Sequence, residues 1–365
     1  MIYILIFLTI FYFINGSFYL IAIYKLLKTK NQRSKIISDF IPFISIVVPA
    51  KNESENIAKC MDSLILQNYP KDRYEIIPVD DGSNDETFKL MKTISKKNSS
   101  IKPLKIDSNL SYGKLDAIDL GILHSKGEII LTTDADVWMG NNWLNTMIKP
   151  FKQNTGMVVG IAMEETSFNP VKSFQLLDAS VIRIISAALV EISKPITCQG
   201  ANLAFRKIAY LEVREKVLKL AKRFGNREWL MQEMNIAAKW EIISQIDKDS
   251  FVYTNSPENW VTLINQRSRW ASTGKQYSKL SIRLYLTIIY LAMLSFLLAL
   301  IFLDFQSVIY LWASKLIIDI LMAIMIAICL EKPKLLLAFP IVYFFQPLIV
   351  VVSGFLGTFK LYSWK

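Results

Sequence analysis

The sequence has few of the side chains that most metal and redox sites use. It contains one histidine, His124, and three widely spaced cysteines, Cys60, Cys198 and Cys329. One histidine excludes zinc sites built from several histidines and disfavours a Ser-His-Asp triad. Three cysteines give no disulfide framework, so we expect the polar part of the chain in a reducing compartment. Any chemistry must then use carboxylates, alone or with a hard cation held by oxygen ligands.

Charged residues are also scarce, at 20% of the chain, whereas 52% of the residues are hydrophobic. Soluble domains average about 25% charged and about 45–50% apolar residues, so part of this chain is expected outside a water-bounded core. The net charge of +11 would suit either nucleic acid or an anionic lipid surface. Because much of that charge lies beside apolar runs, we expect a lipid bilayer as partner and no nucleic acid.

The first apolar run predicts a membrane anchor. Residues 1–24 contain no charged side chain, and about 20 such residues can cross a bilayer as a helix. Basic residues follow this run, whereas in a cleaved signal peptide they precede it. Since positive flanks stay inside, residues 25–41 are predicted to be a basic linker on the cytosolic side.

Three further spans are predicted over residues 284–303, 305–330 and 335–359. Four spans place residues 25–283 in the cytosol and the C-terminus outside. We therefore expect an integral membrane protein, of a bacterial inner (plasma) membrane, whose polar domain is cytosolic.

Two of these spans carry unusual residues. Lys315 and Asp319 are four residues apart, so they share a helix face and can neutralise each other. This pair either helps the helices to pack or takes part in the passage of a substrate through the membrane part of the protein. Pro340 and Pro347 should kink the last span, which could alternatively be a re-entrant segment.

Residues 42–254 alternate between strand-like and helix-like segments. Branched apolar runs at 43–49, 74–80 and 128–134 predict buried parallel strands. Between these runs, residues 54–67, 85–97 and 113–125 have helical periodicity. The pattern predicts an α/β domain with a mostly parallel sheet and with ligands at the carboxyl ends of its strands. No G-x-G-x-x-G or P-loop sequence follows a strand, so a nucleotide must be held in another way.

Acidic residues end two of the predicted strands, as Asp80-Asp81-Gly82-Ser83 and as Asp134-Ala135-Asp136. Each pair alone could be a turn or a helix cap. Two pairs at one sheet edge would repel each other unless a cation or hydrogen-bond donors lay between them. A D-x-D spacing puts both acids on one side of an extended segment, where they can bind Mg²⁺ or Mn²⁺ on a diphosphate.

These residues resemble the motifs of membrane-bound family 2 glycosyltransferases, the group of cellulose, chitin and hyaluronan synthases and ceramide glucosyltransferases. The resemblance covers residues 43–275 and implies a GT-A nucleotide-sugar-binding, Rossmann-like fold. Its motifs occur in the family's order: Pro49-Ala50-Lys51-Asn52-Glu53, Asp80-Asp81-Gly82-Ser83, Gly113-Lys114, Asp134-Ala135-Asp136, Cys198-Gln199-Gly200-Ala201-Asn202 and Gln266-Arg267-Ser268-Arg269-Trp270.

The resemblance also implies roles for single residues. The implied nucleotide-binding residues are Pro49, Ala50, Glu53, Asp80, Asp81, Lys114, Asp134, Gln266, Arg269 and Trp270. Asp136, with Asp134 beside it, would hold Mg²⁺ or Mn²⁺, while Gln199, Gly200 and Trp270 would contact the acceptor. The alternatives are surface ion pairs or helix caps for the acids and a helix at the membrane surface for Arg269 and Trp270.

The predicted catalytic base departs from the family pattern. The family has Glu-Asp followed by apolar helix positions, whereas this chain has Gln232-Glu233. The register puts Glu233 where the aspartate base belongs, and a glutamate can do the same work if it reaches the acceptor hydroxyl. Glu228 is the reserve candidate, and a helix-capping role is the alternative.

Residues 255–283 mix tryptophan and leucine with arginine and lysine, as interfacial amphipathic helices do. One base, one metal and no nucleophile imply an inverting transfer of a hexose from a UDP-sugar to a membrane lipid or lipid-linked acceptor, which forms a β-glycoside. A processive synthase that extends a polysaccharide is the alternative. An alternative of another class is a transporter or receptor that binds a nucleotide without turnover. Nothing in the sequence indicates an oligomeric state.

Overall fold

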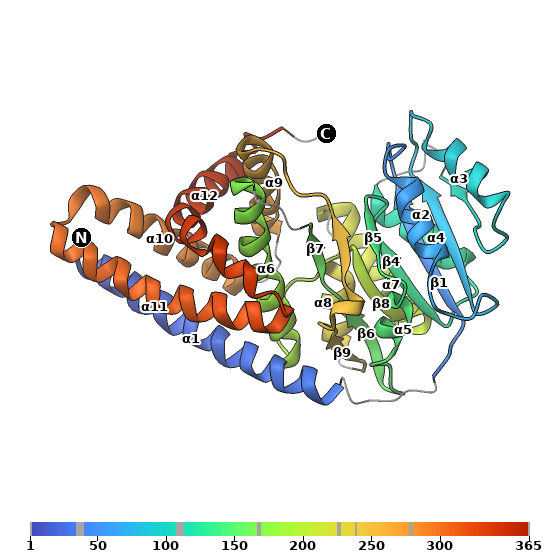
Figure 1. Cartoon of the computed structure of the whole chain (residues 1–365), viewed down its shortest axis with the longest axis horizontal. Coiled ribbons are helices and arrows are strands. Elements are labelled where there is room, and N and C mark those ends of the chain that lie inside the picture. Colours follow the sequence, from blue (N-terminus) through green and yellow to red (C-terminus); the bar gives the residue numbers. More distant parts are fainter. Residues whose placement is uncertain are drawn as a thin grey trace. The chain divides into compact units, whose positions relative to one another are not determined.

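The computed structural model describes residues 2–33, 40–106, 113–165, 169–224, 228–237, 239–276 and 280–363. The chain divides into a sheet unit and a helical unit, and most of their elements are labelled in Figure 1. The sheet unit comprises Lys25–Glu164 and Ser186–Asn255. The helical unit comprises Met1–Tyr24, Glu165–Ile185 and Ser256–Lys365.

A seven-stranded sheet forms the centre of the sheet unit, in the order β3-β2-β1-β4-β8-β6-β9. Its strands are β1 (Ile44–Ala50), β2 (Tyr74–Asp80), β3 (Leu104–Lys105), β4 (Ile129–Thr133), β6 (Thr155–Val159), β8 (Asn202–Arg206) and β9 (Glu241–Ser244). β1 pairs in parallel with β2 and β4, whereas β8 runs antiparallel to both β4 and β6. The predicted mostly parallel α/β fold is confirmed, and the antiparallel β8 is a feature that the sequence pattern did not predict.

Helices cover both faces of this sheet because its strands are apolar on both sides. They are α2 (Ile57–Ile65), α3 (Thr87–Ser95), α4 (Lys114–His124), α5 (Trp143–Ile148), α7 (Lys207–Phe224) and α8 (Glu228–Ala237). Successive strand residues point to opposite faces, so Ile46 packs in one core with Cys60 of α2, and Val47 packs in the other with Ile118 of α4. A Cβ added to Gly121 would lie 2.5 Å from Val47 Cγ1, so α4 lies close to β1.

A second sheet of three strands begins directly after the D-x-D sequence. Its order is β5-β10-β7, with β5 (Val137–Met139), β7 (Ala162–Glu164) and β10 (Val252–Thr254). Trp138 of β5 stacks on Tyr253 of β10, and Lys59 Nζ lies 3.0 Å from the centroid of the Trp138 ring. Asp134 and Asp136 therefore lie where the chain passes from the large sheet to the small one.

The long apolar helices are α1 (Ile2–Arg33), α6 (Pro170–Glu191), α10 (Leu280–Phe302), α11 (Phe305–Leu330) and α12 (Phe339–Phe359). Among the described residues, five segments are long and apolar enough to cross a membrane, namely Tyr3–Arg33, Pro170–Glu191, Leu280–Phe302, Phe305–Leu330 and Pro333–Phe359. α1 continues beyond the predicted anchor, so residues 25–33 of the predicted linker are helical. α12 follows a short 3₁₀ helix, η3 (Pro333–Ala338), and contains Pro340 in its first turn and Pro347 in its interior.

α6 is the candidate span that the sequence did not predict. Its most apolar window is 72% buried, against 17–44% for the four others. A helix that is apolar on most sides and covered by protein is a core helix as readily as a membrane span.

The predicted pairing of Lys315 with Asp319 is confirmed. Lys315 is fully buried, and its ammonium contacts the Asp319 carboxylate one turn away on α11. The Tyr12 hydroxyl of α1 donates to the same carboxylate, and Lys315 Nζ donates to the Tyr343 carbonyl of α12 at 3.4 Å. The charges thus neutralise each other and tie three helices together.

The predicted amphipathic stretch over 255–283 contains α9 (Trp260–Ser272), then the 3₁₀ helix η2 (Thr273–Gln276), and the first residues of α10. Leu263, Arg267 and Ser268 of α9 are buried within the protein. One face of α9 therefore packs against other helices of the helical unit.

Candidate active site

The carboxyl ends of β2 and β4 lie on either side of β1, at the same edge of the sheet. All three strands are parallel, and Ala50 at the end of β1 is paired with Asp80 at the end of β2. The Asp81 amide donates to the Ala50 carbonyl at 2.9 Å. Both acidic sequences therefore leave the sheet at one edge, where ligands bind in open α/β sheets.

Side-chain hydrogen bonds join the loops that follow β1 and β2. Asn52, which has a φ of 55°, donates its amide to Ser83 Oγ at 3.0 Å and accepts the Asn84 amide on its side chain at 2.9 Å. The Glu53 amide donates to Thr87 Oγ1 at 2.8 Å. The two loops thus form one preorganised surface, in which Glu53 is one of the predicted nucleotide ligands and Asn52 is a link that the sequence motif did not reveal.

Asp80 and Asp81 are almost fully buried, at 0% and 5% exposed. Asp80 Oδ1 accepts the Ser83 amide at 3.3 Å, across a turn in which Gly82 has a φ of 72°. Asp80 Oδ2 is buried and has no hydrogen-bond partner in the described part of the chain. A buried carboxylate oxygen costs free energy until a donor reaches it, so Asp80 suits a ligand hydroxyl or imide N–H. Pro49 and Ala50 are buried inside β1, so their backbone forms the floor of this surface.

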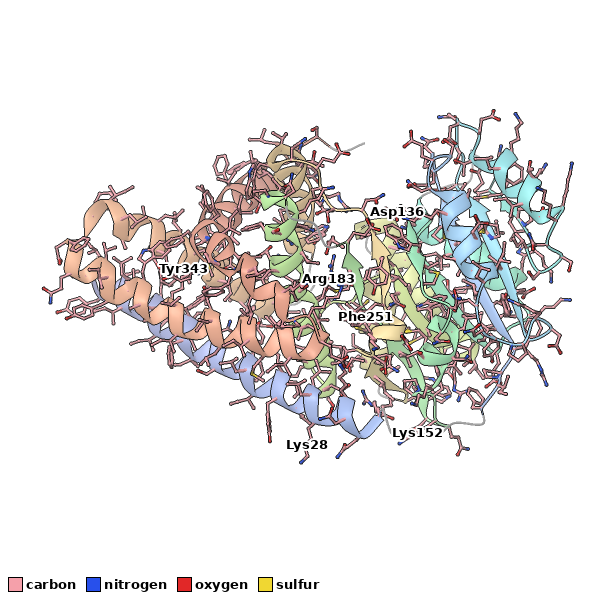
Figure 2. The ribbon with its side chains drawn as sticks, in the orientation of Figure 1. Lys28, Asp136, Lys152, Arg183, Phe251 and Tyr343 are labelled. Atoms are coloured by element: carbon pink, nitrogen blue, oxygen red, sulfur yellow. The ribbon has the colours of Figure 1, made fainter. Side chains whose placement is uncertain are left out.

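Asp134 and Asp136 lie beside a cation. Lys114 Nζ, at the start of α4, is 2.7 Å from Asp134 Oδ2. Burial and then the charge of Asp134 raise the pKa of Asp136, labelled in Figure 2, to about 6, although the positive charge of Lys114 acts in the opposite direction. Glu53 also raises this pKa. The site therefore carries more negative charge than Lys114 neutralises.

Cys60, buried on α2, lies beside the segment that carries Asp134 and Asp136. Its thiol donates to the Asp134 carbonyl at 3.5 Å. Burial raises the pKa of this thiol, and the charges of Asp136, Asp134 and Glu53 raise it further. Three carboxylates from two loops thus act on one buried atom. Cys60 itself is an inert core residue, because a thiol with a raised pKa is a poor nucleophile.

The residues present fit a divalent metal ion whose ligands come partly from the protein and partly from a substrate. Asp134 and Asp136 are two hard oxygen donors in a negatively charged setting. Among the described residues, no group of three or more His, Cys, Asp or Glu side chains could hold a metal by itself. Mg²⁺ is usually held by one or two carboxylates together with phosphate oxygens and water, which is the donor set that this edge and a bound diphosphate would supply.

The Gln199-Gly200 turn lies next to the same edge. Asn202 begins β8 and pairs with Thr133 at the end of β4, and Thr132 Oγ1 donates to the Gly200 carbonyl at 3.5 Å. Gln199 Oε1 accepts the Ala162 amide at 2.5 Å, which leaves its amide group for an acceptor. Asn202 is fully buried and bonds Trp143, Ile161 and Ser250, so this residue of the motif is structural.

Glu233, the predicted base, lies in the middle of α8 and is partly exposed. Its neighbour Gln232 donates to the Ile196 carbonyl at 3.1 Å, which ties α8 to the segment that leads into Gln199. The Glu233 carboxylate makes no hydrogen bond or ion pair within the described part of the chain. The side chain of Glu228, the reserve candidate, lies outside the described residues.

Gln266, Arg269 and Trp270 lie on α9, in the helical unit, and each is partly exposed. Gln266 Oε1 accepts from Gln175 Nε2 of α6 at 3.1 Å. The guanidinium carbon of Arg267 lies 4.5 Å from the Trp270 ring centroid. From the sequence, no role was predicted for Arg267. Its spacing of three residues from Trp270 on a helix could have predicted the contact between the two side chains.

Part of the chain is similar to proteins of known families. Residues 45–210 match the profile of the family described as Glycosyl transferase family 2. A beta-monoglucosyldiacylglycerol synthase from Nostoc sp. is 27% identical over 251 residues, which are 66% of this chain and 51% of that protein. A poly-beta-1,6-N-acetyl-D-glucosamine synthase from Staphylococcus aureus is 25% identical over 273 residues, 73% of this chain and 62% of that protein. The chain thus spans between half and two thirds of these relatives.

A solved structure supports the fold. A mannosyltransferase from Pyrobaculum calidifontis, determined with GDP-Man and Mn²⁺, superposes with a TM-score of 0.54 at 17% identity, over 94% of this chain and 98% of that chain. This likeness shows the GT-A fold. The similarity to family 2 glycosyltransferases lies in residues 45–210, which the family profile matches.

Proposed function

We propose that the protein is an inverting glycosyltransferase that moves a hexose from a UDP-sugar to a membrane lipid or lipid-linked acceptor and forms a β-glycoside. The observation that carries this proposal is the partly buried, negatively charged pair of Asp134 and Asp136 beside Lys114 at the carboxyl edge of the sheet. A divalent cation would neutralise the two carboxylates, and a diphosphate would pair with both the cation and Lys114.

The nucleotide would occupy the surface formed by the loops after β1 and β2. The Oδ2 of Asp80, unpartnered among the described residues, and the carboxylate of Glu53 can accept hydrogen bonds from ribose hydroxyls and from the uracil imide. Asp81 lies at the same strand end, and Lys114 can move from Asp134 to a phosphate oxygen, since both are anionic partners for an ammonium.

Asp136 and Asp134 would hold Mg²⁺ or Mn²⁺. When bound, such an ion stabilises the charge that develops on the departing nucleoside diphosphate. The chain's own part is to hold the two carboxylates side by side at the junction of β4 and β5 and to keep the Asp136 side chain largely buried.

Glu233 would take the proton from the acceptor hydroxyl as that oxygen attacks the anomeric carbon from the face opposite the diphosphate. Direct displacement inverts the configuration, so an α-linked donor gives a β product. The two relatives described above, both named for β-linked products, support this outcome. Gln199, Gly200 and Trp270 would contact the acceptor, with Gln266 and Arg269 closing the nucleotide side.

Purified full-length protein in detergent, supplied with UDP-glucose, Mn²⁺ and a bacterial lipid extract, tests the proposal. We expect release of UDP and a lipid whose mass increases by one hexose. Asp136→Asn should lower transfer at least about 100-fold, because a charge-stabilising group is lost. Glu233→Gln should lower transfer about 100-fold or more while UDP still binds. Full transfer by Asp136→Asn would refute the metal assignment, and binding without any turnover would favour a transporter or receptor.

A processive polysaccharide synthase is the second candidate, because the Staphylococcus aureus relative is named for a polymer and its match covers 73% of this chain. The two candidates differ in product. One added hexose on a lipid supports the lipid transferase, and a polymer of many sugars from the same donor supports the synthase.

A further inference from the structure

A buried ion pair joins α6 to α9 within the helical unit. Arg267 Nη2 lies 2.6 Å from Asp178 Oδ2, and the two side chains are only 6% and 9% exposed. Gln346 of α12 donates to the other oxygen of Asp178 at 3.4 Å. These contacts join the three helices, which are labelled in Figure 1.

The pair contacts one of the residues predicted to act in the site and is linked to a second one through Gln175. The Arg267 guanidinium covers the Trp270 ring, 4.5 Å from its centroid. Arg267 also donates to Gln175 Oε1 at 2.8 Å, while the amide of the same Gln175 donates to Gln266 at 3.1 Å. Gln175 and Asp178 are three residues apart on one face of α6, so α6 holds Gln266 directly and Trp270 through Arg267.

Apolar contacts hold the α9 backbone independently of this pair. The Trp260 ring contacts Phe174 of α6 edge to face at 5.5 Å and stacks on Phe345 of α12 at 6.0 Å. A Cβ added to Gly357 of α12 would lie 2.4 Å from the Ser268 carbonyl oxygen, so the two helices are in backbone contact. Removal of the ion pair should therefore change side-chain orientation more than helix position.

A buried ion pair is weak evidence for stability, because desolvation of both charges offsets their attraction and apolar replacements are often neutral. We infer that Gln175, Asp178 and Arg267 are positioning residues, which fix the orientation of Gln266 and Trp270 for the transfer reaction. This inference rests on the proposed function for its reaction, and on the contacts above for its geometry.

The test uses the full chain, labelled with 5-fluorotryptophan, in lipid nanodiscs. The chain has eight tryptophans, and Trp270→Phe identifies the fluorine signal of Trp270. Asp178→Asn and the double variant Asp178→Leu/Arg267→Met should each shift or broaden that signal. The double variant should keep the melting temperature of the wild type, since it leaves no unpaired charge. With UDP-glucose and diacylglycerol as probes, transfer should fall about 10–100-fold through misplaced groups.

Glu75→Gln is the matched control, because Glu75 is also a buried, lysine-paired acid but lies in β2, away from the strand ends of the site. It should leave the Trp270 signal and the transfer rate per folded molecule unchanged. An unmoved Trp270 signal in the double variant would overturn the inference, and so would a moved signal with full transfer. A moved signal in a protein whose wild type transfers no sugar would support the positioning contact and refute the proposed function alone.

Discussion

At the scale of single residues, Lys114 neutralises an acid that the metal would also use. Its ammonium lies 2.7 Å from Asp134 Oδ2, so a cation that binds Asp134 must displace it. A nucleoside diphosphate offers the displaced ammonium a new partner. The contact therefore favours entry of metal and nucleotide together over entry of the metal alone.

Lys114→Met should separate the competition of Lys114 with the metal for Asp134 from its binding of the nucleotide. Without nucleotide, we expect tighter Mn²⁺ binding than in the wild type, because Asp134 has lost its competing ammonium. We expect binding of UDP to weaken about 10–150-fold, as for the loss of one charged hydrogen bond of about 1.5–3 kcal/mol. Electron paramagnetic resonance of free Mn²⁺ and calorimetry of UDP binding measure the two quantities.

Lys59→Met is the control for a general change of charge, because Lys59 faces the Trp138 ring near β5. We expect it to change Mn²⁺ binding much less than Lys114→Met does. Equal effects from the two variants would show that net charge, and not the Lys114–Asp134 contact, governs metal entry.

Glu75 gives a pH-dependent contribution to stability. Burial raises its pKa, but hydrogen bonds from Lys102 at 2.6 Å, Ser45 at 2.6 Å and the Lys126 amide at 2.7 Å outweigh burial and lower it below the usual value. A lowered folded-state pKa means that the carboxylate stabilises the fold above its usual pKa of about 4.3 and loses this effect as pH falls through the folded value.

Glu75→Gln should therefore lower the free energy of unfolding by about 1–3 kcal/mol at pH 7, as expected for buried hydrogen-bonding groups that lose their partner. The difference from the wild type should shrink when the pH falls below about 4. Melting temperatures of the full chain in detergent, measured from pH 7 to pH 3, check this. If the stability difference between wild type and variant stays constant with pH, the charge of Glu75 does not contribute to stability and the substitution acts through packing.

At the scale of elements, α9 and α12 depend on one glycine. A Cβ on Gly357 would lie 2.4 Å from the Ser268 carbonyl oxygen and 3.0 Å from Ala271 Cβ, and neither the backbone nor a helix methyl can move aside. Gly354 lies one turn earlier, where an added Cβ would meet the edge of the Tyr290 ring at 2.7 Å. The Tyr290 side chain can rotate away from an added methyl group, whereas the backbone at Ser268 can move only if the whole helix moves.

Gly357→Ala should therefore lower the melting temperature more than Gly354→Ala does. The expected cost is about 1–3 kcal/mol, which is typical of overpacking. It should also lower transfer, because α9 carries Gln266, Arg269 and Trp270. Thermal melting and transfer assays of the two variants provide the comparison. Equal melting temperatures would contradict the proposed contact between α9 and α12.

Sequence alone predicted the elements whose pattern is local. The branched runs predicted as strands at 43–49, 74–80 and 128–134 correspond to β1, β2 and β4, which are apolar on both faces. The acids that follow β2 and β4 meet at one edge because these strands are parallel. The partners of Arg267 were not predictable, because Gln175 and Asp178 lie about 90 residues away on α6. The same holds for Asn52, whose bonds to Ser83 and Asn84 depend on tertiary structure.

At the scale of the whole molecule, the sheet decides which apolar helices can cross a membrane. β6 lies before α6 in the chain and β8 lies after it, yet β6 and β8 are hydrogen-bonded neighbours in one sheet. Strands paired in this way must be on the same side of a bilayer. α6 therefore does not cross, although its length and composition allow it, and four of the five described candidate helices remain.

If the sheet unit is inside and four helices cross, Asp304, between α10 and α11, lies outside. Glu331, which directly follows α11, then lies inside. Single cysteines at Asp304, Glu331 and, in the sheet unit, Asn98 test this in a variant that lacks the three native cysteines. An impermeant maleimide should label Asp304→Cys in intact cells, but Glu331→Cys and Asn98→Cys only after permeabilisation. Basic Lys332 and Lys334 favour this orientation because positive flanks stay inside. Labelling of Asn98→Cys in intact cells would place the sheet unit outside, away from the cytosolic nucleotide sugars that the proposed reaction needs.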